Sequence, residues 1–197
     1  MSTAAAILAA GRGSRLGGDA SKPLLEWRGR SLVAWALDAA LDSGLDPVVV
    51  VVGYRSDDVR AALPTDRGVV VIDNPEWEEG IASSVRAALA ALTPMDDVVA
   101  VAIGLADQPL VAAEAYRRVK AVSDDSGIVV PTYGGQPGNP VKLARSLWPE
   151  AMTLRGDTGA RALMRDRVVG RVDCTDTGSA ADVDTLEDLE RLQQEDQ

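Results

Sequence analysis

The residues best suited to chemistry are basic side chains in a glycine-rich stretch and one aspartate that follows an apolar run. Arg12, Arg15 and Lys22 are interspersed with glycines near the N-terminus, and Asp107 follows DVVAVAI at 97–103. Glycine lets the backbone approach a ligand closely, and successive loop N–H groups can point at an anion. Basic side chains supply the charge that a triphosphate needs, and an aspartate on a rigid strand end suits Mg²⁺. The combination favours a site for a triphosphate and a divalent cation.

Each feature also has a plain structural interpretation. A glycine-rich turn can merely connect a strand to the next element. Asp107 can cap a helix that starts near Val111, with Pro109 shaping the turn between them. The residues alone leave both interpretations open.

Net charge is unevenly distributed along the chain. The 197 residues sum to −10, whereas residues 1–30 carry five basic and two acidic residues, which makes them +3. A local positive excess on an acidic protein favours a small polyanion and argues against a nucleic-acid partner. The sequence has no histidine, which removes serine–histidine triads, histidine bases and histidine metal ligands. Any catalysis must therefore use carboxylates, lysine, arginine and the backbone.

Two common phosphate-binding motifs are absent. The dinucleotide fingerprint G-x-G-x-x-G fails because Leu16 stands where the third glycine is needed. The NTPase phosphate loop fails because Gly18 is followed by Asp19 and Ala20, where Lys and Ser or Thr are required.

The number of cysteines and the length of the N-terminal apolar run indicate where in the cell the protein is expected. The single cysteine, Cys174, allows no disulfide within the chain and fits a reducing compartment. The apolar run at 4–10 has no basic residue before it and is too short to span a bilayer. We therefore expect a cytoplasmic protein with no membrane partner.

The elements that must position these residues follow from a regular alternation of patterns. Helices are predicted at 31–43, 56–63, 82–92 and 111–122, and buried strands at 4–9, 48–53, 68–72, 97–103 and 127–131. A hairpin-like excursion is predicted at 131–143, a helix after Asp157 and a terminal helix after Thr185. Strands separated by such helices imply right-handed crossovers. The sequence predicts one α/β domain over 1–197, with three Rossmann-like layers, a mainly parallel sheet and helices on both faces.

In such a sheet, ligands bind outside the carboxyl ends of the strands. The glycine-rich stretch at 11–18, the segment 73–75 and the segment 104–111 each follow a predicted strand. We therefore expect all three to converge on one edge of the sheet.

Several segments together resemble the MobA-like nucleotidyltransferases, in particular the molybdopterin cytidylyltransferase branch. The opening LAAGRGSRLGG and SKPLLEWRGRSLVAWAL is similar to that branch's pattern LAAGxGxRMGxxKxLLxxxGxxL. The resemblance continues through NPEWEEGIASSVRAAL, LADQPL, PTYGGQPGNPVKL, LRGDTGARALM and DVDTLEDL, so that it covers Leu8 to Leu189. Two departures are visible: the spacer from Gly17 to Lys22 is longer than usual, and Asn139 replaces the family's histidine.

The resemblance implies a role for individual residues. The nucleotide contacts would come from Leu8, Ala9, Ala10, Gly11, Arg12, Gly13, Arg15, Lys22, Asn74 and Ser84. The catalytic set would be Arg15, Lys22 and Asp107, with Mg²⁺ held by Asp107 and Asp182. The acceptor contacts would come from Gly138, Asn139, Pro140, Gly156, Asp157 and Arg161.

Simpler roles remain open at three of these places. Ser83 and Ser84 can serve as ordinary caps at a helix N-terminus. Asp157 and Arg161 have the spacing of a surface ion pair. Asp184 is the alternative to Asp182 as second metal ligand.

The activity implied by the resemblance is a Mg²⁺-dependent nucleotidyl transfer. A phosphate oxygen of the acceptor would attack the α-phosphate of an NTP, and pyrophosphate would leave. The implied acceptor is molybdopterin, and a molybdenum enzyme would receive the product. Ala10 favours CTP over GTP, because the guanylyl-transferring branch usually has glycine there. The alternatives are a carrier or maturation protein without transfer activity, and an NAD(P)H-dependent oxidoreductase on the same fold.

Overall fold

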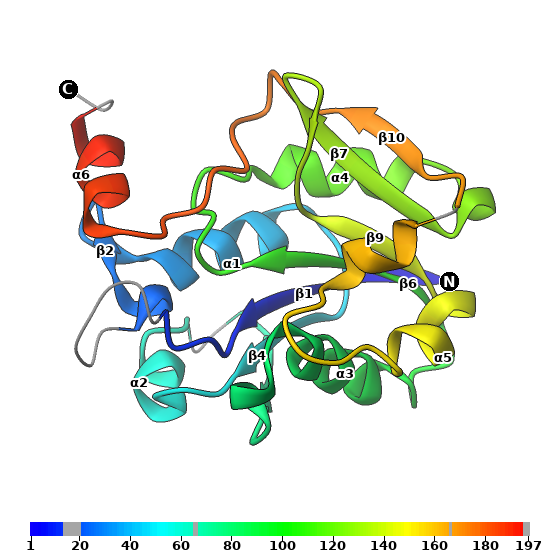
Figure 1. Cartoon of the computed structure of the whole chain (residues 1–197), viewed down its shortest axis with the longest axis horizontal. Coiled ribbons are helices and arrows are strands. Elements are labelled where there is room, and N and C mark those ends of the chain that lie inside the picture. Colours follow the sequence, from blue (N-terminus) through cyan, green and yellow to red (C-terminus); the bar gives the residue numbers. More distant parts are fainter. Residues whose placement is uncertain (14–20, 65–66, 166, 195–197) are drawn as a thin grey trace.

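A computed structural model describes residues 1–13, 21–64, 67–165 and 167–194 (Figure 1). Arg15 and most of the Gly17 to Lys22 spacer lie outside these ranges. The main sheet has the strand order β10-β7-β9-β6-β1-β4-β5, with β8 paired to β7. Its strands are β1 (Ser2–Ala9), β4 (Val48–Val52), β5 (Val70–Asp73), β6 (Val98–Leu105), β7 (Ile128–Tyr133), β8 (Gln136–Pro137), β9 (Val141–Ala144) and β10 (Gly170–Asp173).

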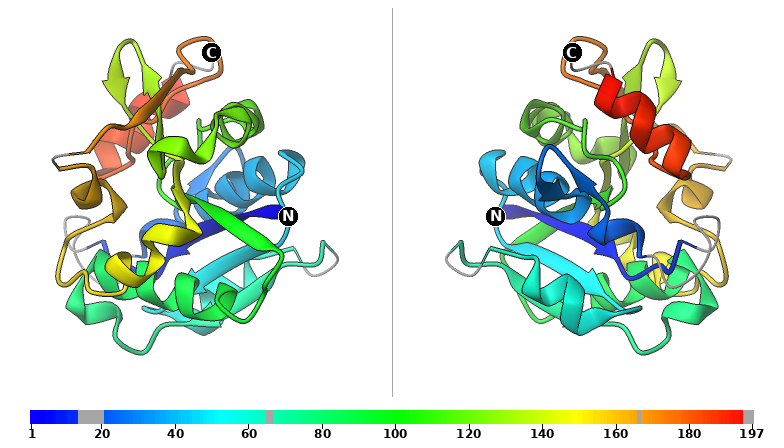
Figure 2. Two further views of the ribbon diagram at one scale, coloured as in Figure 1. Left: turned by 90° about the vertical axis from the view of Figure 1, so that its right-hand side faces the viewer. Right: turned by 90° about the vertical axis from the view of Figure 1, so that its left-hand side faces the viewer.

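The central strands are buried because both faces of the sheet are covered. β1 alternates between two cores: Ala4, Ala6 and Leu8 pack on one side, and Ala5, Ile7 and Ala9 on the other. The helices α1 (Leu32–Asp42) and α4 (Ala113–Ala121) cover one face, and α3 (Ile81–Leu92) and α5 (Trp148–Ala151) cover the other (Figure 2). The predicted three-layer α/β fold is confirmed.

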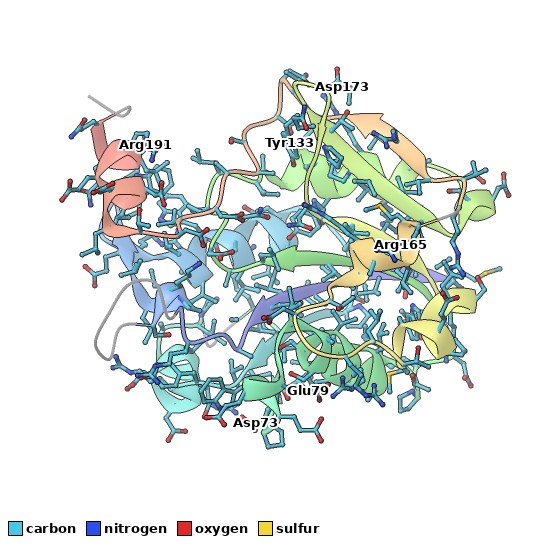
Figure 3. All side chains as sticks on the ribbon, in the orientation of Figure 1. Asp73, Glu79, Tyr133, Arg165, Asp173 and Arg191 are labelled. Atoms are coloured by element: carbon cyan, nitrogen blue, oxygen red, sulfur yellow. The ribbon has the colours of Figure 1, made fainter. Side chains whose placement is uncertain are left out.

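The remaining helices lie at the rim. α2 (Ser56–Ala61) follows β4, and α6 (Leu186–Gln194) ends the described chain. Charged side chains such as Asp73, Asp173 and Arg191 project from the rim into solvent (Figure 3). None of the helices within the described ranges is long and apolar enough to cross a membrane.

The sheet is parallel except at β9 and at the short strand β8, which is antiparallel to β7. β1 pairs in parallel with β4 and with β6, whereas β9 is antiparallel to both β6 and β7. The predicted hairpin at 131–143 is present as β7 and β8, where Thr132 faces Pro137. The predicted helix after Asp157 is a 3-10 helix at Ala160–Met164.

The C-terminal segment after β10 returns to the carboxyl edge of the sheet. The Ser179 amide donates to the Leu110 carbonyl over 3.2 Å, and the Val183 amide donates to the Asp107 carbonyl over 2.9 Å. α6 then packs through Leu192 in a small cluster with Trp27 and Leu32, next to the two-stranded sheet of β2 (Glu26–Trp27) and β3 (Arg30–Ser31). We call residues 174–185 the C-terminal arm.

Candidate active site

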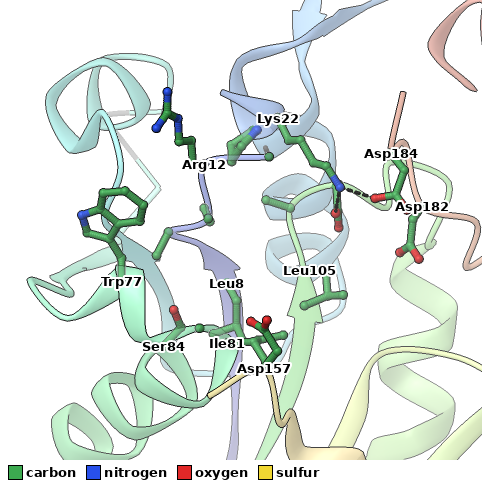
Figure 4. Close-up of a pocket in the computed structure, with 18 of the residues that line it drawn as sticks. Leu8, Arg12, Lys22, Trp77, Ile81, Ser84, Leu105, Asp157, Asp182 and Asp184 are labelled. Atoms are coloured by element: carbon green, nitrogen blue, oxygen red, sulfur yellow. Dashed lines mark hydrogen bonds and ion pairs between the residues drawn. The ribbon is translucent and has the colours of Figure 1, made fainter. Parts of the chain in front are cut away.

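A cleft of about 780 Å³ opens at the carboxyl ends of β1 and β6. β1 lies between β4 and β6 in the sheet, and the helices α1 and α3 leave on opposite faces. This is the switch point at which open α/β sheets bind ligands. Six segments line this main cleft (Figure 4): Leu8–Gly13 at the end of β1 and in the loop after it, Lys22 with Pro23, five residues within 77–84, residues 105–107, Asp157, and Asp182 with Asp184 of the C-terminal arm.

The loop after β1 is held against the neighbouring strand by close backbone packing. The Tyr54 amide donates to the Ala10 carbonyl over 3.0 Å. A Cβ added at Gly53 would lie 2.6 Å from Trp77 Cβ and 2.9 Å from Ala10 Cβ, so glycine is what lets these segments meet. Ala10 is buried in this contact, and both Ala10 and Trp77 are among the residues that line the cleft.

Arg12 and Lys22 occupy opposite sides of the main cleft (Figure 4). The Arg12 guanidinium lies 5.3 Å from the centre of the Tyr54 ring, and that ring lies 5.3 Å from the Trp77 ring. Lys22 packs its aliphatic chain against Gly13, whose φ of +72° and missing Cβ leave room for it. One basic group is thus placed beside aromatic rings and the other beside carboxylates.

Two aspartates of the cleft, Asp107 and Asp184, pair with Lys22. The Lys22 Nζ lies 3.4 Å from Asp107 Oδ2 and makes a second ion pair with Asp184 Oδ1. Burial raises the pKa of Asp107 above its ordinary value, the Lys22 charge lowers it again in part, and the nearby Asp182 charge raises it. Asp107 is therefore a carboxylate whose ionisation depends on a neighbouring cation.

Gln108 connects two of these segments, a role that sequence reasoning missed. Its Nε2 donates to Asp182 Oδ1 over 2.7 Å and to the Ala180 carbonyl over 2.8 Å. Gln108 is 2% exposed, and its Oε1 accepts from Asn139 Nδ2 over 2.9 Å. The amide therefore fixes where the Asp182 carboxylate points.

The donor set fits a cation that keeps part of its water shell. No group of three or more His, Cys, Asp or Glu side chains forms a metal cage within the described ranges. Asp107 and Asp182 do line the same cleft, and Mg²⁺ typically takes one or two protein carboxylates and completes its shell with water and phosphate. The ammonium of Lys22 already pairs with Asp107 and with Asp184, so this part of the cleft attracts a cation.

Asn74 and Ser84 differ in their position relative to the main cleft. Asn74 is buried; its Nδ2 donates to Ser83 Oγ over 2.8 Å and to Ser84 Oγ over 3.1 Å, and its Oδ1 accepts from the Glu76 amide. Ser84 lines the main cleft, whereas Asn74 is not among its lining residues. Asn74 therefore braces the wall of the cleft from behind.

A second cavity of about 220 Å³ adjoins the main cleft and shares Leu8, Ile81, Leu105, Asp157 and Asp182 with it. Three of the expected acceptor residues, Asn139, Asp157 and Arg161, line this second cavity. Asp157 and Arg161 form no ion pair with each other in the described structure, and the turn between them is not α-helical.

The other expected acceptor residues do not line the second cavity. Gly138 and Pro140 flank Asn139 in the chain, and the Gly156 carbonyl accepts from the Ala82 amide at the start of α3 over 3.1 Å. These three residues therefore shape the backbone around the cavity.

Comparisons with known proteins agree with this architecture. A model of the MobA-like NTP transferase domain matches residues 5–172. The nicotine blue oxidoreductase of Paenarthrobacter nicotinovorans is 33% identical over 196 residues, which is 94% of each chain. The molybdenum cofactor cytidylyltransferase of Escherichia coli is 25% identical over 185 residues, covering 93% of this chain and 91% of the relative.

Among solved structures, Rv0371c from Mycobacterium tuberculosis superposes with a TM-score of 0.83 at 31% identity and covers 98% of both chains. Its complex with manganese superposes with a TM-score of 0.80 at 29% identity.

Proposed function

Because the chain belongs to the MobA-like NTP transferase family and is a nucleotidyltransferase, we propose that it transfers a cytidylyl group from CTP to the phosphate of molybdopterin, with Mg²⁺ as its metal. The name of the Escherichia coli relative supports the acceptor, and the manganese complex of Rv0371c supports a divalent metal. Residues 1–197 act as one domain in this proposal, and a molybdenum enzyme receives the product.

One observation carries the proposal: a single cleft contains the glycine-rich loop, Lys22, Asp107 and Asp182. Nucleotidyl transfer is mostly positioning and charge neutralisation, so it needs no covalent nucleophile and no histidine. An oxygen of the acceptor phosphate forms a bond to the α-phosphorus of CTP, the bond to the β-phosphate breaks, and pyrophosphate leaves.

In this proposal, different residues of the cleft bind the metal and the triphosphate. Asp107 and Asp182 would hold Mg²⁺, which neutralises charge on the phosphates when it is bound. Lys22 and Arg15 clamp the triphosphate. The ion pairs of Lys22 with Asp107 and Asp184 support its part in this, because Lys22 can exchange one carboxylate for a phosphate oxygen. The backbone from Leu8 to Gly13 lies along the nucleotide, with Arg12 assisting from the aromatic side.

A second candidate function comes from the relative named as an oxidoreductase. That relative favours binding of NAD(P)H and hydride transfer to a small molecule. Hydride transfer uses the chemistry of its cofactor and has no need of paired carboxylates beside a lysine. The geometry of the cleft therefore favours nucleotidyl transfer, and a carrier without transfer activity would need those carboxylates even less.

Isothermal titration and product analysis distinguish these functions. We expect CTP to bind only with Mg²⁺ present, and pyrophosphate to appear when CTP, Mg²⁺ and molybdopterin are mixed with the protein. Binding of NADPH without metal, together with no pyrophosphate from any NTP, would contradict the proposal in favour of the oxidoreductase. Binding of neither nucleotide would favour the carrier.

A further inference from the structure

Arg86 of α3 lies behind the wall of the main cleft. Its side chain is 13% exposed, and it is not among the residues that line the main cleft or the second cavity. A guanidinium stays charged in a protein, so one that is mostly removed from water needs partners for its N–H groups. The identity of those partners shows which parts of the chain it holds together.

The Arg86 guanidinium makes four hydrogen bonds, all to groups outside α3. Its Nη1 donates to Glu79 Oε1 over 2.9 Å and to the Leu154 carbonyl over 2.8 Å. Its Nη2 donates to Glu76 Oε2 over 2.9 Å and to Glu79 Oε2. The bidentate pair keeps the pKa of the Glu79 carboxyl below its ordinary value, so Glu79 remains ionised beside the guanidinium. Arg86 therefore joins the residues just before α3 to the chain around Leu154.

The segment 154–157 packs closely against the start of α3. Gly80 has a φ of +111°, and an added Cβ there would lie 2.5 Å from the Gly156 carbonyl carbon and 2.6 Å from Asp157 Oδ1. The Gly156 carbonyl accepts from the Ala82 amide over 3.1 Å. Asp157, the last residue of this segment, lines both the main cleft and the second cavity (Figure 4). The position of its carboxylate therefore depends on how this segment is held.

The two segments that Arg86 joins differ in their other support. Residues 76–79 are also held by Asn74, whose Oδ1 accepts from the Glu76 amide over 3.0 Å. Within the described ranges, the segment 154–157 has one other hydrogen bond to α3, the one from the Ala82 amide. Loss of the guanidinium should therefore loosen the segment 154–157 more than residues 76–79.

We propose that Arg86 is a positioning residue for the transfer reaction: by joining residues 76–79 to the segment 154–157, it holds the Asp157 carboxylate at the boundary between the main cleft and the second cavity. This inference rests on the proposed function, because it concerns the acceptor of the same reaction. It goes beyond that function by giving a role in the reaction to a side chain that lines neither cavity. A shift of about 1 Å in a group that orients a substrate can cost roughly 100-fold in rate.

The test compares Arg86→Gln with Arg145→Gln. The Arg145 guanidinium also donates to three backbone carbonyls, all within 93–98, and lies 4.9 Å from the centre of the Trp148 ring. These carbonyls lie at the start of β6, at the opposite end of that strand from the cleft. Hydrogen exchange measures local opening of the segment 154–157, and thermal melting measures stability. Steady-state transfer gives separate KM values for CTP and for molybdopterin.

We expect Arg86→Gln to speed hydrogen exchange in the segment 154–157. The kcat/KM for molybdopterin should fall by about 10- to 100-fold, mostly through KM, with the KM for CTP little changed. Arg145→Gln should lower the melting temperature without either effect. Because Arg86 acts through Asp157, the double variant Arg86→Gln/Asp157→Asn should be about as slow as Asp157→Asn alone.

Gly80→Ala moves the same carboxylate without changing Arg86. Its added methyl group would collide with Gly156 and Asp157, so it should also raise the KM for molybdopterin. This variant decides the matter if Arg86→Gln does not fold.

An unchanged KM for molybdopterin in the folded Arg86→Gln and Gly80→Ala variants would overturn the inference. So would a double variant whose loss equals the product of the two single losses. Failure of the proposed function looks different, because the wild-type protein would then form no pyrophosphate from CTP and molybdopterin. Hydrogen exchange alone then decides: unchanged exchange of the segment 154–157 in Arg86→Gln would show that Arg86 does not hold it.

Discussion

At Asp107, burial and the charge of Lys22 have opposite effects on the pKa of the carboxyl group. Burial favours its neutral form, Lys22 favours the carboxylate, and Asp182 again favours the neutral form. A second cation would relieve the same conflict by adding positive charge between the two aspartates. At the residue scale, this conflict supports the proposal that a cation binds here together with the triphosphate.

Asp107→Asn tests this arrangement, because it keeps the shape of the side chain and removes its charge. We expect transfer to slow by about 100- to 1,000-fold, the range for loss of one electrostatic contact in a transition state. The melting temperature should not fall, since the substitution removes a charge that burial disfavours. The matched control is Asp97→Asn, an exposed aspartate just before β6. The structure already excludes Asp107 as the cap of α4, whose N-cap is Ala112, so transfer at the wild-type rate in Asp107→Asn would mean that Asp107 takes no part in transfer.

Ala10→Gly tests the choice of base. Ala10 is buried and is one of the residues that line the main cleft, as is Trp77, so we expect its methyl group to limit how far a bicyclic base can enter. We expect the wild-type protein to prefer CTP over GTP by about 10- to 200-fold, the discrimination available from one methyl-sized contact, and Ala10→Gly to reduce that preference. A competition assay with equal CTP and GTP measures it. Predominant use of GTP by the wild-type protein, or an unchanged ratio in the variant, would mean that Ala10 only packs the strand.

The sequence predicted part of the site and could not predict the rest, for physical reasons. Lys22, Asp107 and Asp182 line one cleft as expected, because parallel strands deliver the residues after their carboxyl ends to one edge. The role of Gln108 depends on a hydrogen bond to a residue 74 positions away, and no local pattern marks such a contact. Asn74 belongs to the expected wall, but only the structure shows that its amide faces two serines.

At the scale of elements, the site depends on the C-terminal arm. The alternation of strand and helix patterns in the sequence predicted no strand or helix for that segment. β10 reads GRVD, too short and polar to signal a strand, and β9 was predicted only as part of an excursion. Both are strands because the sheet supplies their partners, β7 for β10 and β6 with β7 for β9. The arm then brings Asp182 and Asp184 back to the cleft.

Gly178→Ala tests whether the position of the arm controls the metal site. Gly178 has a φ of +140°, and an added Cβ would clash with the Leu110 carbonyl beneath the arm. Because the Ser179 amide donates to that same carbonyl, the clash should lift the arm and shift Asp182. We expect a higher Mg²⁺ requirement and a slower transfer, with CTP binding at saturating Mg²⁺ little changed.

The control for this substitution is Gly135→Ala. Gly135 also has a positive φ, +81°, but an added Cβ there would meet nothing within 4 Å. It therefore carries a similar backbone penalty without touching the arm. If both variants have the same Mg²⁺ dependence as the wild-type protein, the arm does not set the metal site.

At the scale of the whole molecule, two separate cores support one sheet. Two tyrosines, one buried and one partly buried, belong to the core beneath α1 and α4. Tyr116 is packed there with Ile7 and Ala102, and the side chain of Tyr133 lies at its edge. Burial raises the pKa of Tyr116 and of Tyr133 above the ordinary value. Because of these raised pKa values, the free energy of unfolding is expected to fall at alkaline pH.

The last prediction concerns this linkage. The folded state keeps the Tyr116 phenol protonated, whereas the unfolded chain loses that proton near pH 10. A raised pKa in the folded state gives stability that is complete below about pH 10 and is lost as the pH rises toward the folded pKa. Tyr116 alone should lower the free energy of unfolding by about 1 kcal/mol per pH unit above pH 10. Urea unfolding at pH 8 and 11 measures the loss, and Tyr116→Phe should lose less than the wild-type protein. Lysine, arginine and Cys174 contribute equally in both proteins, so an identical loss in the variant would show that the Tyr116 hydroxyl is reached by solvent before the core unfolds.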